Sequence, residues 1–325
     1  MVLLKTSEEF TATKKRRMRA KLIFNPIAGT AGESPIQLMD VIHEMQTCKL
    51  VPEPFLVEPG CDLPGVIQDA ISRGIRMFVV CGGDGTISAV ARSLAGTPAT
   101  LGLIPIGTQN NTALSLGIPA DIPAAIAILR NGRRIKVDVG MVSCGNSNTP
   151  FLEVCSVGLV SSLFPSADDI QHGKLERVGD FLTTLVGSPP AEIHLLLDNK
   201  QEIHKRGHVV LVSNMPYIGL HYQVGTAASF QDGLLDVLFF ADLSKLNLLG
   251  YVLRGVGEGK PEDPRIQHYH VRRVDIDTQP AMPVMADGSA VGEGLVRIEV
   301  QRHALAVMVS QPAPAEHPEP EVIHA

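Results

Sequence analysis

The stretch Met77–Leu94, which reads MFVVCGGDGTISAVARSL, decides the fold. Its apolar residues belong to a run from Arg76 to Cys81, which stops where glycines surround a single charged residue, Asp84. A short apolar run that glycines terminate predicts a buried strand. The residues with helical spacing that follow are Ile87, Val90, Ala91 and Leu94. The stretch therefore predicts a strand, a tight turn and a helix in direct succession.

The same alternation runs through the first half of the chain. We expect strands at Ala20–Asn25, Pro54–Val57, Arg76–Cys81 and Thr100–Ile106, each followed by a helical pattern. Ser34, with Pro35 behind it, predicts the start of the first helix, and Asp121 is the expected cap of the last. This order predicts an α/β N-terminal domain over residues 20–140, a doubly wound and mostly parallel sheet with helices on both faces.

After residue 140 the pattern changes to short strands. They are expected at Lys136–Ser143, Phe151–Gly158, Glu192–Asp198, His208–Ser213, Leu234–Ala241, Val271–Asp277, Val284–Asp287, Leu295–Val300 and Ala304–Val309. Helical patterns are fewer, at 175–186 and 243–254. We therefore expect a β-rich, antiparallel second domain over residues 141–310, whose last strand has the option of returning to the first domain. Residues 1–19 read as a polar, basic extension and 311–325 as a disordered tail.

Composition excludes several classes of protein. The 325 residues are 45% hydrophobic and carry a formal net charge of −6, so we expect no nucleic-acid partner, which would need a broadly basic domain. Five cysteines without a CxxC pair argue against a disulfide framework or a zinc site and favour a reducing compartment. No signal-peptide core or membrane-spanning run is apparent. We expect a cytoplasmic protein and leave peripheral membrane contact open, because Lys14–Arg17 is a basic run.

Glycine-rich turns follow three of the predicted strands, at Asn25–Gly29, Gly82–Thr86 and Gly107–Asn110. Ligands of open α/β sheets bind at this edge, where amides at a helix start attract phosphate. A carboxylate in the same turn would repel phosphate unless a cation lies between them, so Asp84 suggests phosphate together with Mg²⁺. The alternative is a plain Asp-Gly turn with Asp84 as a helix cap. The Walker and GxGxxG patterns are absent, which argues against a P-loop NTPase and an ordinary dinucleotide site.

Five motifs then make the pattern specific. They are Asn25-Pro…Gly29, Gly82-Gly-Asp-Gly-Thr86, Ile104-Pro-Ile-Gly-Thr-x-Asn110, Ser229-Phe-Gln-Asp-Gly-Leu-Leu-Asp-Val237 and Ala286-Asp-Gly288. In this order and spacing the chain resembles the diacylglycerol kinase catalytic-domain family, which includes sphingosine and ceramide kinases and bacterial soluble lipid kinases. The resemblance covers roughly residues 20–310. The GGDGT loop is shared with NAD kinases and 6-phosphofructokinases, whereas the other motifs are more particular to lipid kinases.

The resemblance implies an ATP- and Mg²⁺-dependent transfer of the γ-phosphoryl group to a lipid hydroxyl, diacylglycerol-like or sphingoid, at a peripheral membrane surface. The nucleotide-binding residues that it implies are Asn25, Pro26, Gly29, Gly82, Gly83, Asp84, Gly85, Thr86, Ile87, Ser88, Thr108 and Asn110.

The resemblance also implies roles for acidic residues. Asp287 matches the proposed general base, while Asp84 and Asp138 match positions that hold Mg²⁺ through water. A structural Mg²⁺ would bind the carboxylate of Asp232 and the backbone carbonyls of Ser229 and Leu234, since hard oxygen ligands suit that cation. Read without the family, each of these residues belongs to an ordinary turn or strand end.

The chain departs from the family pattern at two informative positions. Asn111 stands where family members commonly have Asp, and Ser289 where they commonly have Glu. A lipid- or nucleotide-binding relative with weakened catalysis therefore stays open as an alternative. The shared GGDGT loop also leaves open a soluble-substrate kinase of the NAD kinase type. Separately, His268 and His270 would share one strand face, but no third metal ligand is close in sequence, which favours solvent-facing residues.

Overall fold

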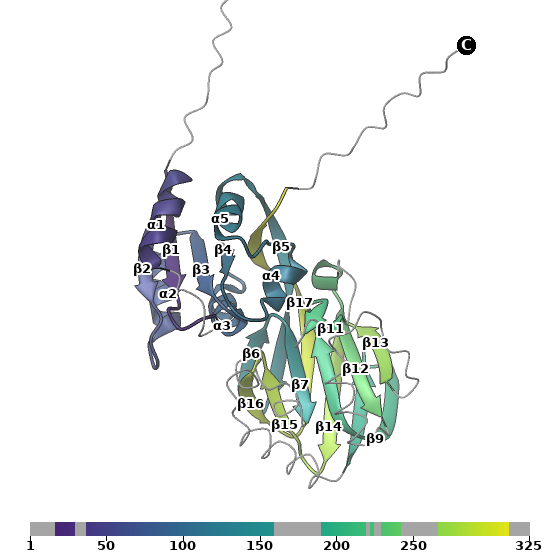
Figure 1. Ribbon diagram of the computed structural model, residues 1–325. Coiled ribbons are helices and arrows are strands. Elements are labelled where there is room, and N and C mark those ends of the chain that lie inside the picture. Colours follow the sequence, from purple (N-terminus) through teal and green to yellow (C-terminus); the bar gives the residue numbers. More distant parts are fainter. Residues whose placement is uncertain are drawn as a thin grey trace, which may run out of the picture.

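The computed structural model describes residues 17–29, 37–158, 190–218, 222–223, 229–241 and 266–311, and the structural statements below concern these residues. The first half consists of β1 (Met18–Phe24), α1 (Leu38–Thr47), β2 (Leu50–Leu56), α2 (Leu63–Ser72), β3 (Met77–Gly82), α3 (Asp84–Leu94), β4 (Thr100–Pro105), α4 (Asn111–Ser115) and α5 (Ile122–Asn131). Strands β2, β1, β3 and β4 lie side by side in that order and are parallel (Figure 1).

Helices cover both faces of the parallel sheet. Alternate residues of each strand point to opposite faces, so each strand packs against helices on both sides. On β3, Phe78 and Val80 pack with the apolar faces of α2 and α3. Met77 and Val79 pack instead with α1 and α5. All six residues of β3 are buried, which agrees with the uninterrupted apolar run in the sequence.

The second half is β-rich. Its elements are β5 (Arg133–Cys144), β6 (Ser147–Phe151), β7 (Val154–Gly158), β8 (Ala191–Leu197), β9 (Gln201–Ser213), β10 (Tyr217–Ile218), β11 (Tyr222–Gln223), the 3-10 helix η1 (Ser229–Gln231), β12 (Leu235–Ala241), β13 (Ile266–Val271), β14 (Arg273–Gln279), β15 (Pro283–Ala286), β16 (Ser289–Glu293) and β17 (Val296–Val309). Its internal strand pairs are antiparallel, and its buried apolar residues form a core of their own. The predicted fold class is therefore confirmed.

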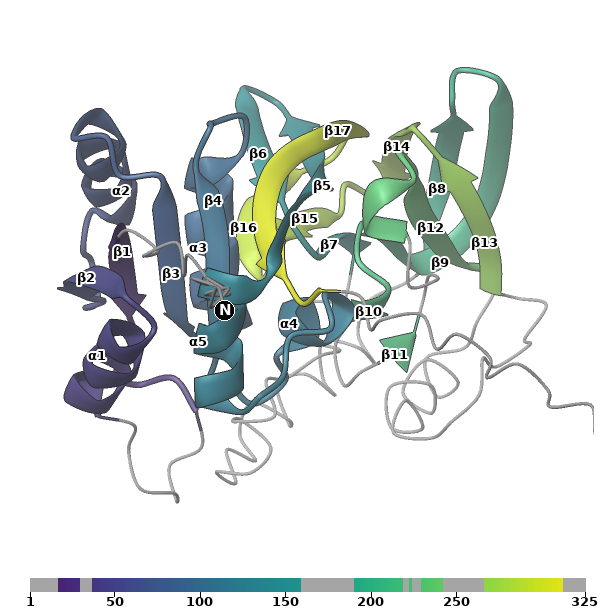
Figure 2. The ribbon, with the colours of Figure 1, turned by 90° about the horizontal axis from the view of Figure 1, so that it is seen from above.

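Strand β17 connects the two halves. It pairs antiparallel with β5 along most of its length, its first residues also pair antiparallel with β14, and its last residues also pair parallel with β4, at Ala306 opposite Thr100. Figure 2 shows β17 in yellow between the two groups of strands. The register shifts between Gln301 and Leu305, where His303 has a φ of +53°. This irregularity brings the His303 amide to a buried carboxylate described below.

Several predicted elements need correction. The strand expected over 151–158 is interrupted, because β6 ends at Phe151 and β7 begins at Val154. The strand expected over 271–277 is divided between β13 and β14, and the two expected over 295–309 form the single strand β17. Helix α1 begins at Leu38 after Gln37, and the predicted cap Ser34 lies outside the described residues, as do the helices expected at 175–186 and 243–254. Asp121 does cap α5, since its Oδ1 accepts a 2.9 Å bond from the Ala124 amide.

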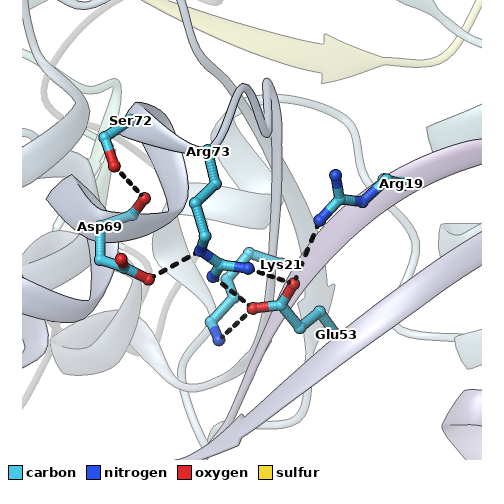
Figure 3. Close-up of polar contacts among 6 residues, drawn as sticks. All are labelled: Arg19, Lys21, Glu53, Asp69, Ser72 and Arg73. Atoms are coloured by element: carbon cyan, nitrogen blue, oxygen red, sulfur yellow. Dashed lines mark hydrogen bonds and ion pairs between the residues drawn. The ribbon is translucent and has the colours of Figure 1, made fainter.

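A cluster of charges ties α2 to the outer strands of the sheet (Figure 3). Glu53 on β2 accepts hydrogen bonds from Arg73 at 2.9 Å and from Lys21 at 3.1 Å, and Arg19 lies 3.6 Å away. Arg73 also contacts Asp69 one turn earlier. The Arg73 hydrogen bonds, with those of Lys21 and both positive charges, lower the pKa of Glu53 to about 2 against the opposing effect of burial.

This pKa predicts a loss of stability in acid. Because the folded-state pKa of Glu53 lies below its ordinary value of 4.5, the stabilisation is complete above pH 4.5 and disappears as the pH falls toward 2. The side chain is 34% exposed, so screening reduces the expected contribution to about 1–2 kcal/mol. Urea unfolding of Glu53→Gln should give a lower midpoint at pH 7 and a flatter pH dependence below 4.5. If Glu53→Gln lost stability below pH 4.5 as steeply as the wild type, this cluster would not be the cause of the acid sensitivity.

Candidate active site

Three glycine-containing turns meet at the carboxyl edge of the parallel sheet. Gly29 has a φ of +102°, and a Cβ there would lie 2.7 Å from the carbonyl oxygen of Ile106. A Cβ on Gly107 would lie 2.5 Å from the Cα of Gly83. Contacts this short admit only glycine, so the backbones of the three turns touch one another. Asn25 also donates a 2.8 Å hydrogen bond to the Thr86 hydroxyl, which joins the first turn to the second.

The N-terminus of α3 is open to a ligand. Gly83 is the N-cap and provides no side-chain hydrogen bond, while its carbonyl accepts from the amides of Thr86 and Ile87, both at 3.0 Å. A Cβ built on Gly85 meets nothing within 4 Å, so there is space in front of this turn. The amides at the start of a helix of eleven residues attract anions through the helix dipole. This arrangement suits a phosphate group.

The remaining residues predicted for the nucleotide lie in three kinds of surroundings. Pro26 and Thr108 are exposed at the rim of the turns. Ile87 and Ser88 are only 0% and 1% exposed, so their side chains lie in the core and do not face a ligand. Asn110 adopts a left-handed conformation, and its amide group bonds both the N–H and the carbonyl of Gly107, at 2.9 and 2.7 Å. Its side chain shapes the turn.

Asp84 lies beside the third turn. Its Oδ2 accepts a 3.1 Å bond from the Asn111 amide, and its Oδ1 accepts a 3.2 Å bond from the Thr112 amide. The departure at Asn111 therefore leaves Asp84 anchored, because the contact uses the backbone of residue 111. The Thr112 hydroxyl in turn donates to the carboxyl group of Glu153.

Asp287 sits in a ring of backbone amides. Its carboxylate accepts hydrogen bonds from Leu152 at 2.7 Å, Glu153 at 2.9 Å and Val154 at 3.0 Å. These amides turn toward Asp287 and leave the strand ladder, which explains the interruption between β6 and β7. Burial raises the pKa of Asp287, and the three amides and the charge of Arg92 only partly oppose it.

Glu153 was missed by the sequence reasoning. The side chain is buried between the two aspartates, and burial together with the charges of Asp84 and Asp287 raises its pKa well above the ordinary value. The raised pKa favours the neutral acid over the carboxylate at this position. The signal that could have found it is a single charged residue in the otherwise apolar segment 151–158, since glutamate is rarely buried without a partner. We call Asp84, Glu153 and Asp287 the acid centre.

Arg92 links the acid centre to the helix behind the GGDGT turn. From α3 its guanidinium donates to the carbonyl of Ala286 at 3.0 Å and to the Ser289 hydroxyl at 3.1 Å. Ser289, the second departure from the family pattern, thus serves as an acceptor that fixes the β15–β16 turn carrying Asp287.

Asp138 lies in a different neighbourhood. Both oxygens of its fully buried carboxylate accept backbone bonds, from Gly233 at 2.8 Å and His303 at 2.7 Å. Within the described part of the chain, none of its contacts reaches Asp84, so we group Asp138 with the turn at Asp232. There Oδ1 of Asp232 accepts a 2.8 Å bond from the Leu234 amide. Burial and the charges of Asp236 and Asp138 raise the pKa of Asp232, although the Leu234 amide opposes them.

Two family models match most of the chain. The Diacylglycerol kinase catalytic domain family matches residues 19–142, and the YegS C-terminal NAD kinase beta sandwich-like domain matches residues 161–309. A diacylglycerol kinase of Bacillus subtilis is 26% identical over 285 residues, 84% of this chain and 90% of that protein. One of Mycobacterium tuberculosis is 30% identical over 192 residues, 58% of this chain and 62% of its own length.

A solved structure extends the comparison to the fold. The crystal structure of a diacylglycerol kinase from Bacillus anthracis superposes with a TM-score of 0.69 at 21% identity, covering 92% of this chain and 98% of that one. The similarity therefore includes both halves of the chain.

Proposed function

Because the chain belongs to the diacylglycerol kinase catalytic-domain family, a family whose membership implies the use of ATP and a lipid substrate, we propose that it transfers the γ-phosphoryl group of ATP to a lipid hydroxyl. The observation that carries the proposal is the meeting of three glycine turns with the acid centre. The turns belong to the nucleotide-binding half, and Glu153 and Asp287 come from the β-rich half. Donor and acceptor of the phosphoryl group would meet between them.

Phosphoryl transfer asks the protein chiefly for positioning and for electrostatic stabilisation. The amides at the start of α3 and the turns at Gly29 and Gly107 would bind the phosphates of ATP, with Pro26 and Thr108 at the rim. Gly82, Gly83, Gly85 and Thr86 supply the backbone of this cradle. We leave the buried side chains of Ile87 and Ser88 out of the proposed contacts.

We assign Asp287 the role of general base. The three amides fix its carboxylate, so that an acceptor hydroxyl could be oriented by it and could give up its proton to it. A raised pKa makes this carboxylate a stronger base than an exposed aspartate. Arg92 acts as a positioning residue, because it contacts the carbonyls of the turn and not the carboxylate oxygens.

The donor set fits a divalent cation. A carboxylate has about four acceptor positions, so Asp84 retains capacity beyond its two amide bonds. Burial and the charges of Asp84 and Asp287 raise the pKa of Glu153, and a cation bound among these carboxyl groups would oppose that shift. We propose that Asp84, through water, holds Mg²⁺, which when bound would neutralise charge on the transferred phosphate.

A second Mg²⁺ at the turn of Ser229, Asp232 and Leu234 stays a proposal. The neighbouring Asp138 has both oxygens bonded to amides, and we propose that it supports the turn. A Cβ on Gly233 would lie 2.5 Å from the Nε of Arg302, so a guanidinium also borders this turn.

None of the helices in the described residues is long and apolar enough to cross a membrane. A lipid kinase of this kind would meet its substrate at a membrane surface, and a diacylglycerol-like or a sphingoid acceptor would each present a hydroxyl.

The test is a phosphorylation assay with γ-labelled ATP, MgCl₂ and mixed micelles that contain diacylglycerol or a sphingoid base, with NAD⁺ in a parallel reaction. We expect label in one lipid and none in NADP⁺. Label in NADP⁺ alone would assign the chain to soluble-substrate kinases. ATP binding without any transfer would identify a binding relative that has lost catalysis.

A further inference from the structure

Two histidines of β13 converge on one buried carboxylate of β12. His268 Nε2 lies 2.8 Å and His270 Nδ1 lies 2.9 Å from the same oxygen, Oδ1 of Asp236. The two imidazole rings are 4.6 Å apart between centroids. The third ligand that the sequence pattern lacked is therefore supplied by the neighbouring strand, in which Asp236 pairs with His270.

The strand geometry makes this convergence a fixed feature. Residues two apart on a strand point to the same face, so His268 and His270 share a side of β13. Asp236 is 3% exposed, whereas the His268 and His270 side chains are 30% and 56% exposed. The carboxylate is thus buried beneath the two imidazoles, which solvent reaches from outside.

The surrounding charge favours a cation. The adjacent turn carries Asp232, and the carboxylate of Asp138 binds the Gly233 amide of the same turn, so two further acidic side chains lie near Asp236. The carboxylate of Asp138 is committed to backbone amides, and Asp232 bonds the Leu234 amide. The Asp236 carboxylate, by contrast, is bonded by the imidazoles of His268 and His270.

We propose that Asp236, His268 and His270 form a binding site for a divalent transition metal such as Zn²⁺. The three ligand atoms lie within 4.8 Å of one another. Two imidazoles and one carboxylate are a donor set that Zn²⁺, Co²⁺ and Fe²⁺ accept, whereas Mg²⁺ prefers oxygen ligands. This site differs in place and chemistry from the acid centre and does not depend on the kinase activity.

A second group, His194, Glu202 and His204, has the same composition but poorer geometry. Its imidazoles lie 3.9 and 3.7 Å from Glu202, and the Glu202 and His204 side chains are 64% and 67% exposed. No buried carboxylate anchors it, so the group serves as the matched comparison.

A metal ion at the proposed site would link β13, at the edge of the sheet, to its neighbour β12. In the described strands, β13 pairs with β12 alone, and β12 begins directly after the turn at Asp232. A bound ion would add a link between β12 and β13 beside their backbone hydrogen bonds. We expect Zn²⁺ to raise the melting temperature, because a ligand that binds only the folded state stabilises it.

The experiment is a Co²⁺ titration of the chelator-treated, reduced full chain, followed by visible absorption without ATP or lipid. We expect one Co²⁺ per chain, displaced by Zn²⁺ and not by Mg²⁺. Loss of a residue that only hydrogen-bonds a metal ligand typically weakens metal affinity by about 10- to 100-fold. His268→Gln and His270→Gln each remove a ligand, so each should weaken Co²⁺ binding by more than that. His204→Gln should bind like the wild type. Both exposed histidines are preferable to Asp236 as test positions, because Asp236 is buried.

Three results would overturn the proposal. They are the absence of stoichiometric Co²⁺ uptake, loss of uptake in His204→Gln but not in His270→Gln, and a sulfur-to-cobalt charge-transfer band, which would place the ion on cysteine. Since neither nucleotide nor lipid is present, a negative result would leave the proposed phosphoryl transfer unaffected.

Discussion

Asp287→Asn is expected to lower the kcat for lipid phosphorylation by about 10²- to 10⁴-fold, the usual contribution of a general base. An asparagine tolerates the left-handed backbone, with a φ of +44°, but cannot accept the proton of the acceptor hydroxyl. Initial rates at saturating ATP and lipid would measure the loss. In the wild type, kcat/KM should rise with pH along a limb whose apparent pKa lies above that of an ordinary aspartate, because burial raises the pKa of Asp287.

The substitution also disturbs structure, so a matched control is needed. Asp198 likewise has a positive φ, of 49°, and its Oδ1 accepts backbone bonds from Arg272 and Arg273, both at 2.9 Å. Asp198→Asn makes the same change at a left-handed residue that accepts backbone hydrogen bonds away from the acid centre, and it should leave kcat unchanged. If Asp287→Asn lost stability but kept its turnover, Asp287 would be a structural anchor and not the base.

Glu153→Ala should lower the free energy of unfolding by about 2–4 kcal/mol, because it opens a cavity and leaves the Thr112 hydroxyl without its acceptor. Glu153→Gln should cost less than about 1.5 kcal/mol, since glutamine has nearly the shape of the neutral acid. Because the raised pKa of Glu153 favours the neutral acid, glutamine should be the milder of the two substitutions. Urea denaturation at pH 7 would measure both variants.

The pair of substitutions also tests the charge state directly. Should Gln destabilise as strongly as Ala, the buried group would have to be a carboxylate, and a cation or a donor would have to balance it. A Glu153→Gln protein that folds well also permits a kinase assay in which one of the three titratable groups of the acid centre has been removed.

Much of the fold follows from local patterns. The apolar run of β3, the glycines after it and the periodic residues of α3 are adjacent in sequence, so their structure could be predicted from periodicity and turn chemistry. The carboxyl ends of parallel strands share one edge, and for that reason the turns at Gly29, Gly83 and Gly107 could be expected near one another.

The acid centre was only partly predictable, because it is assembled by long-range contacts. Glu153 meets Thr112 across 41 residues, and Asp287 meets the Leu152 amide across 135. Nothing in a strand pattern shows that three successive amides leave the ladder for a distant carboxylate. The surroundings of Asp138 could not be predicted for a similar reason, since its partners at Gly233 and His303 depend on a turn and a strand irregularity.

The path of β17 limits how this molecule can move. The strand pairs with β5 along its length, with β14 at its start and with β4 near its end. A hinge that separated the two halves would have to bend or break that strand, so we expect the halves to move little relative to each other. Under the proposed phosphoryl transfer, capture and release of substrates would then depend on the turns at the carboxyl edge of the parallel sheet.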